Sequence, residues 1–217
     1  MSTTLSTLRA RARRYLDETT ADRWTDAQVN AYINEGIRFA QSEIERANHD
    51  YFLRECTFTA SAGTTEAAFP STIYGHQIRN VQVFESSTVA SGLPVRMQPA
   101  QLEWVYENQY YSGRPKGYYP LAGYMIWAPM LQSTCTFRFV YNKKEADLSA
   151  DTDTVDAISD EFTDIIALYA AAIALELKNI PSGAVRAILE RRLQQMRGDA
   201  TPIDPIVIPQ IGVDDNA

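Results

Sequence analysis

The residue types that carry catalysis are sparse in this sequence of 217 residues. Its two histidines, His49 and His76, have no serine, cysteine or acid at the spacing of a known catalytic motif. Neither a GxxxxGK[ST] nor a GxGxxG phosphate-binding loop is present. A zinc site needs more ligands than two distant histidines and two distant cysteines provide. We therefore expect no enzyme, no catalytic or metal-binding residue and no cofactor.

The two cysteines, Cys56 and Cys135, both fall in segments with the periodicity of a β-strand. One pair of cysteines in a chain of this length does not make a disulfide framework. We expect two buried free thiols.

Acidic residues gather in one segment without any basic residue between them. They are Glu145, Asp147, Asp151, Asp153, Asp156, Asp160, Glu161 and Asp164. The run 151–156 departs from a calcium-binding EF-hand loop at its fifth and sixth positions. Two interpretations stay open: a solvated loop that leads into acids favourable at a helix N-terminus, or a channel wall that repels a DNA backbone.

Large aromatic residues are concentrated in one stretch of the chain. They are Trp104, Tyr106, Tyr110, Tyr111, Tyr118, Tyr119, Tyr124 and Trp127. Consecutive tyrosines do not all point inward, so we assign Tyr110, Tyr111, Tyr118 and Tyr119 to an interface with a neighbouring subunit or a tail protein. Packing within the segment and sugar stacking are the alternatives.

The residues after Gly198 combine prolines with branched apolar side chains, and prolines at this spacing exclude a helix. The segment includes Pro202, Ile203, Pro205, Ile206, Val207, Ile208, Pro209 and Ile211. Disordered tails are usually polar. We expect an extended arm that docks onto a partner, as an added strand or in a groove. The alternative is an arm folded over its own core.

Helical periodicity surrounds a β-rich middle. A capped helix begins after Thr25, with Gln28 in the position of a capping box. Helices are predicted over residues 4–17, 26–48 and 160–179, and from Pro181 to an end at Gly198. Between the two helix pairs, strands are predicted over 52–59, 78–85, 118–121, 124–128 and 134–141, and a short helix over 98–111.

This order predicts an α+β fold: a four-helix bundle with a β-rich insertion (a small barrel or sandwich) between helices 2 and 3, plus an extended C-terminal arm. The predicted domains are residues 1–50 and 157–197 for the bundle core, 51–156 for the insertion with its acidic linker, and 198–217 for the arm.

The formal net charge of −7 argues against tight, non-specific binding to nucleic acid, although a negative protein can still surround DNA that slides past. The chain begins without the apolar region of a secretory signal, and its longest apolar run is well short of the about 20 residues that span a bilayer. We expect synthesis in the host cytoplasm and no membrane partner.

The order of elements resembles that of tailed-phage head-to-tail adaptor proteins. Its features are a basic first helix, Trp24 before the capped second helix, a β insertion, an acidic linker, an alanine-rich helix and an extended tail. The loop with Gly113-x-Pro115 and the later Ile126-x-x-Pro129 are also similar to that family. The basic helix carries Arg9, Arg11, Arg13 and Arg14.

The resemblance implies a structural virion protein at the portal–tail vertex. Such adaptors form a ring, about twelve subunits in size, beneath the portal protein, where they extend the DNA channel and offer a platform for tail or nozzle proteins. It assigns the arm to the portal. The arginines of the first helix either face an acidic portal surface or solvate the helix. The alternatives are a tail-tube or nozzle protein of the same virion, a carbohydrate-binding virion module, and a hydrolase that depends on a histidine.

Overall fold

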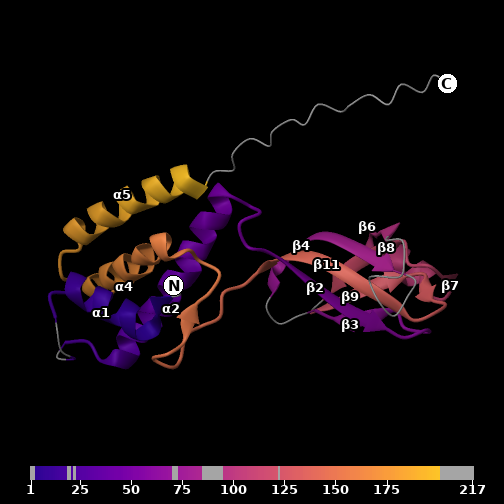
Figure 1. Ribbon diagram of the computed structural model, residues 1–217, viewed down its shortest axis with the longest axis horizontal. Coiled ribbons are helices and arrows are strands. Elements are labelled where there is room, and N and C mark those ends of the chain that lie inside the picture. Colours follow the sequence, from indigo (N-terminus) through magenta and orange to yellow (C-terminus); the bar gives the residue numbers. More distant parts are fainter. Residues whose placement is uncertain are drawn as a thin grey trace, which may run out of the picture.

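The computed structural model describes residues 3–18, 21, 23–69, 73–84, 95–121 and 123–200. The long helices gather at one end of the long axis and most strands at the other (Figure 1). The α+β class is confirmed, with five α-helices in the described part of the chain. They are α1 (Leu5–Tyr15), α2 (Asp26–Ala47), α3 (Leu102–Asn108), α4 (Thr163–Leu177) and α5 (Gly183–Ala200).

The first two helices begin where their caps predict. The Thr4 hydroxyl accepts a hydrogen bond from the Thr7 amide at 3.3 Å and starts α1. At α2, the Gln28 amide donates to the Thr25 hydroxyl at 3.3 Å, and the Thr25 amide donates to Gln28 Oε1 at 3.0 Å. This reciprocal pair satisfies two backbone donors that a helix start leaves open, so the predicted capping box is confirmed.

Helix α4 is the centre of the helical end. It follows a short 3-10 turn, η2 (Asp160–Phe162), and packs against α1, α2 and α5. Its small side chains permit close approach: a Cβ placed on Gly36 of α2 would lie 2.7 Å from the carbonyl oxygen of Ile166. One hydrophobic core joins these four helices, and it also includes Phe52 and Leu148.

Helix α5 continues past Gly198 to Ala200, so the predicted end at Gly198 is wrong by two residues. A glycine inside a helix costs stability but does not by itself stop the helix. Among the residues that the structure describes, no helix is long and apolar enough to cross a membrane.

Two four-stranded sheets form the other end. The first has the order β2-β11-β4-β5 and the second β3-β9-β8-β6. Their strands are β2 (Leu53–Ala60), β3 (Glu66–Ala68), β4 (Ile73–Phe84), β5 (Val95–Arg96), β6 (Gln98–Pro99), β8 (Gly117–Leu121), β9 (Tyr124–Ala128) and β11 (Cys135–Lys143). In the first sheet β11 pairs antiparallel with both β2 and β4. In the second, β8 and β9 form the predicted hairpin, and its turn places Gly123 at a φ of +92°.

Side chains from both sheets meet in a second hydrophobic core. Trp127 of β9 packs on Phe137 of β11, with ring centroids 4.6 Å apart, and Phe58 of β2 stacks on the same Phe137 ring. In the described part of the chain, this core shares no residue with the helical core. We call α1, α2, α4 and α5 the helical unit, and the two sheets with α3 the β unit.

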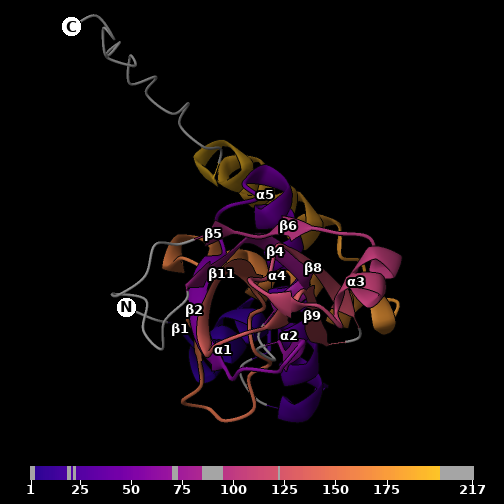
Figure 2. The same cartoon turned by 90° about the vertical axis from the view of Figure 1, so that its right-hand side faces the viewer.

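Helix α3 is shorter than the predicted 98–111, because Gln98–Pro99 instead forms β6, which pairs parallel with β8. Val105 of α3 packs on Ile126 and Ala128, on the outer face of the second sheet. Figure 2 shows α3 beside β8 and β9. Two short pairs complete the fold: β1 (Thr3–Thr4) with β12 (Thr154–Val155), and β7 (Ser112–Gly113) with β10 (Met130–Leu131).

Candidate functional site

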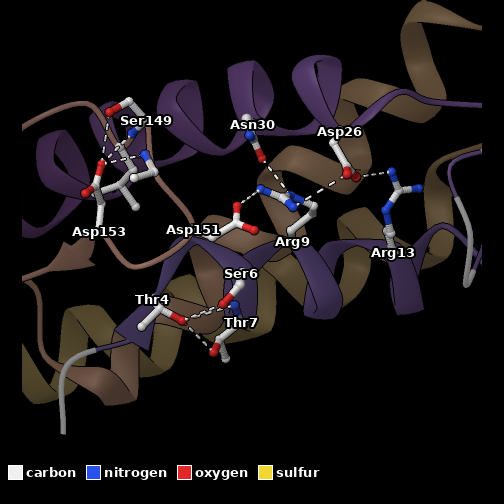
Figure 3. Close-up of polar contacts among 12 residues, drawn as sticks. Thr4, Ser6, Thr7, Arg9, Arg13, Asp26, Asn30, Ser149, Asp151 and Asp153 are labelled. Carbon is white, nitrogen blue, oxygen red and sulfur yellow. Dashed lines mark hydrogen bonds and ion pairs between the residues drawn. The ribbon is translucent and has the colours of Figure 1, made fainter.

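Arg9 and Arg13 of α1 lie within a network of intramolecular contacts (Figure 3). Arg9 Nε donates to Asn30 Oδ1 at 2.9 Å, and the same guanidinium forms ion pairs with Asp151 and, at 3.6 Å, with Asp26. Arg9 therefore connects α1 both to α2 and to the acidic segment that follows the β unit.

Arg13 is buried and pairs with Glu18 at 3.0 Å and with Asp26 at 2.7 Å. It also donates to the carbonyl oxygen of Trp24 at 3.0 Å. The hydrogen bond from Arg13 holds the pKa of Asp26 below its ordinary value. This arginine fixes the connection between α1 and α2, since its partners lie on both sides of that connection.

Arg11 turns to the other side of α1, where it donates to the Thr163 hydroxyl at 3.0 Å and to Asp164 at 3.1 Å. Burial, followed by the nearby Asp164 carboxylate, raises the pKa of Tyr15 on the same side. Arg14 is exposed. Contact with an acidic portal surface stays a prediction for all four arginines, and the charges of Arg9, Arg11 and Arg13 are already matched within the chain.

The acidic segment also binds within the chain. Asp147 pairs with Arg38 at 2.7 Å, and Asp153 accepts from the amides of Ser149 and Ala150 at 2.7 and 2.8 Å, which lowers its pKa. These contacts tie the segment to the helical unit and to itself. Most acids of the segment are exposed or lie in the first turns of η2 and α4, as the solvated-loop interpretation expects. The channel wall stays a prediction.

A row of polar side chains along α2 holds the segment that returns from the β unit. Asn34 donates to the carbonyl of Leu148 at 3.0 Å and accepts from the Leu148 amide at 2.9 Å. Gln41 does the same over two residues: it donates to the Lys143 carbonyl at 2.8 Å and accepts from the Glu145 amide at 3.0 Å. Each side-chain amide thus offers the returning backbone the donor and acceptor that a neighbouring strand would offer.

The row ends at Glu45, which accepts from Asn142 Nδ2 at 2.6 Å. Asn142 donates also to the His49 carbonyl, at 3.1 Å, and its side chain is completely buried. We call Asn34, Gln41 and Glu45, with the Asn142 side chain and the backbone of 143–148, the clasp. Sequence reasoning missed it, although polar residues at 34, 41 and 45 repeat at helical spacing, which places them on one side of α2.

The β unit carries an aromatic surface around α3. Its exposed members are Trp104, Tyr106, Tyr110, Tyr111 and Tyr124. In β9 the side chains alternate, because Met125 and Trp127 enter the core between the sheets and Ile126 packs under α3. Tyr124 therefore lies on the same outer face as α3.

The four tyrosines assigned to an interface do not lie in one environment. Tyr110 and Tyr111 are 80% and 66% exposed, whereas Tyr118 is buried in the core between the sheets and Tyr119 is half-buried. Burial raises the pKa of Tyr118. The side chain of Tyr118 packs in this core, and Tyr110 and Tyr111 are the pair open to a partner. The assignment of the four tyrosines to an interface stays a prediction.

The remaining sequence predictions concern chemistry and the arm. Both cysteines are free; Cys135 is buried but Cys56 is only half-buried, which corrects the prediction of two buried thiols. His49 is exposed, and the His76 side chain lies outside the described part of the chain, as does the arm from Pro202 to Ile211. No group of three or more potential metal ligands occurs among the described residues.

The SU10 adaptor protein family model matches residues 3–207. The chain belongs to this family of phage head-to-tail adaptors. No curated protein matches the chain. The match covers the helical unit and the β unit together, so the adaptor is a structural phage protein of the virion and its resemblance to head-to-tail adaptors is confirmed.

Proposed function

We propose that this adaptor assembles as a ring of about twelve subunits beneath the portal protein, where it extends the DNA channel and offers a docking platform to tail or nozzle proteins. The observation that carries the proposal is the family match, which spans both units of the chain. The arrangement in Figure 1 supports a division of roles, because the helical unit and the β unit have separate hydrophobic cores.

The helical unit is a four-helix bundle core that builds the ring wall, and the β unit is its insertion. In domain terms, residues 1–50 and 157–197 form the core and 51–156 the insertion with its linker. The arm follows α5, whose helix ends at Ala200. Viral DNA passes through the ring without sequence-specific binding, which agrees with the net charge of −7.

The aromatic surface is the contact of the β unit with a neighbouring subunit or a tail protein. Tyr and Trp are enriched at protein interfaces, and Tyr110 and Tyr111 are the most exposed aromatic residues of that surface. The double variant Tyr110→Ser/Tyr111→Ser should keep the folded chain and lose assembly with its partners. Leu177→Ser is the matched control, because it removes a 64% exposed apolar side chain from the helical unit. Equal assembly by the double variant and the control would contradict this role.

The arm is the segment that engages the portal. The family match continues to residue 207 and so includes the first prolines and isoleucines of the arm. Apolar, proline-spaced segments bind partners in extended form at low ordering cost. A chain that stops after Ala200 should fold with an unchanged melting temperature and no longer attach to the portal. Retained attachment would refute the role of the arm.

A carbohydrate-binding virion module is the second candidate, favoured by Trp104, which is 37% exposed on the aromatic surface. It predicts that soluble glycans quench the fluorescence of Trp104. The adaptor role is favoured if a panel of bacterial surface glycans leaves this fluorescence unchanged and the protein binds the portal.

A further inference from the structure

The two units of the chain are joined by polar contacts. Their hydrophobic cores share no residue within the described ranges, and Phe52 and Leu148, which flank the joint, both belong to the helical core. Across the joint itself lie Asn142 with Glu45, Asn142 with the His49 carbonyl, and Arg79 with the same carbonyl at 3.2 Å. Burial of apolar area therefore stabilises each unit and anchors Phe52 and Leu148 on the helical side, and the contacts between these anchors and the β unit are polar.

Polar contacts of this kind are directional, and water can replace them only where the returning segment separates far enough from α2 to admit it. The clasp consists of such contacts, and they follow one another in order: Glu45 at residue 142, Gln41 at residues 143 and 145, and Asn34 at residue 148. Because Leu148 stays fixed in the helical core, release of the clasp would free residues 142–147, where the chain leaves β11, from α2.

We infer that the clasp is a positioning device: it fixes the orientation of the β unit on the helical unit, and it opens without unfolding either unit. Asn34 and Gln41 are the positioning residues. Their side chains hold the returning backbone and make no contribution to either hydrophobic core. This positioning role depends neither on ring formation nor on portal binding, so it can be tested with the isolated chain.

Gln41 is the stronger member of the pair because its side chain is 1% exposed and one of its two backbone partners, Glu145, is also buried. Glu145, whose amide it accepts from, is 3% exposed, and its carboxylate accepts hydrogen bonds from the amides of Asp156 and Ala157. The clasp thus connects the joint to the approach of α4. Opening of the clasp therefore displaces residues 143–147 and leaves the helices folded.

The double variant Asn34→Ala/Gln41→Ala tests the inference, with Arg38→Ala as the matched control. Arg38 lies on the same side of α2, but its pair with Asp147 is solvent-exposed at both ends. Amide hydrogen exchange at Glu145 and Leu148 should be about three to ten times faster in the double variant, the factor expected for one lost hydrogen bond, and unchanged in the control. Exchange at Ile166 and Trp127, in the two cores, should stay slow in both variants.

The angle is measured by spin labels on cysteines placed at Ala187 of α5 and Gln132 of the β unit, both exposed, with Cys56 replaced by serine. The distance distribution should be narrow in the parent chain and in the Arg38→Ala variant, and broad in the double variant. An equally narrow distribution in the double variant would overturn the inference. Faster exchange at Ile166 or Trp127 in the double variant would overturn it too, because opening of the clasp would then require unfolding of a unit.

The single variant Asn34→Ala covers the case in which the double variant does not fold. Asn34 is only partly buried, so its loss leaves both cores intact. It should speed exchange at Leu148 and leave exchange at Glu145 as it is in the parent chain. Unchanged exchange at Leu148 would show that Asn34 does not hold the returning segment.

Discussion

The crossing of α2 and α4 gives the sharpest prediction for the helical unit. Gly36→Ala adds a methyl group whose carbon would lie 2.7 Å from the carbonyl oxygen of Ile166, and an ordinary contact requires 3.4 Å or more. The helices must separate by about 0.7 Å, since a backbone oxygen does not rotate away as a side chain does. Overpacking of this kind costs about 1 to 3 kcal/mol.

The gain from replacing glycine in a helix is about 1 kcal/mol and opposes that cost. Because the contact is with backbone, we place the overpacking cost near its upper bound and expect a net loss of about 1 to 2 kcal/mol in the free energy of unfolding. In a chain of this size the loss lowers the melting temperature by about 2 to 8 °C. Circular dichroism and calorimetry measure it.

Gly198→Ala is the matched control. Gly198 also lies inside a helix, but a Cβ there would meet no atom within 4 Å. The control should therefore gain up to about 1 kcal/mol from helix propensity alone. The reasoning fails if Gly36→Ala stabilises the chain as much as Gly198→Ala does, because the helices would then tolerate the added carbon.

Two further predictions concern ion pairs. Arg13→Ala leaves the buried carboxylate of Glu18 without its ion-pair partner and should lower the free energy of unfolding by about 3 kcal/mol. Arg38→Ala breaks an exposed ion pair and should lower it by less than about 0.5 kcal/mol. Equal losses in denaturant unfolding would contradict the claim that burial makes the first pair the more important one. Hydrogen bonds from Arg186 and Ser182 lower the pKa of Glu176 from 4.5 to about 2, so its contribution to stability is complete above pH 4.5 and is lost as the pH falls toward 2. Arg186→Gln should move that pKa back toward 4.5 in a carboxyl NMR titration, and an unchanged pKa would refute the assigned cause.

Local pattern predicts most of the elements of this fold. The capping box of Thr25 and Gln28, the hairpin of β8 and β9 and the apolar face of α4 all depend on residues close together in the sequence. Composition also predicts that aromatic side chains reach the surface, because consecutive tyrosines on one strand point to opposite faces. Tyr118 and Tyr119 of β8 follow that rule, because Tyr118 packs between the sheets and Tyr119 packs under α3. Tyr110 and Tyr111 lie in the turn after α3, and both are exposed.

Contacts across the chain do not follow from local pattern. Arg9 and Asp151 are 142 positions apart, and Gln41 and Glu145 are 104 apart, so neither pair leaves a signal in a sequence window. A basic helix and an acidic segment each predict exposure when considered alone. Their charges are matched only when the fold brings the returning segment back to α1 and α2. For the same reason the clasp becomes visible only in the structure.

The central claim is that this chain is an adaptor that binds the portal as a ring. Native mass spectrometry of the purified protein, alone and after mixing with the portal protein of the same phage, tests it most directly. We expect a monomer that joins the portal at one copy for each portal subunit. A chain that stays separate from the portal would contradict the account and would favour another tail component or a binding module.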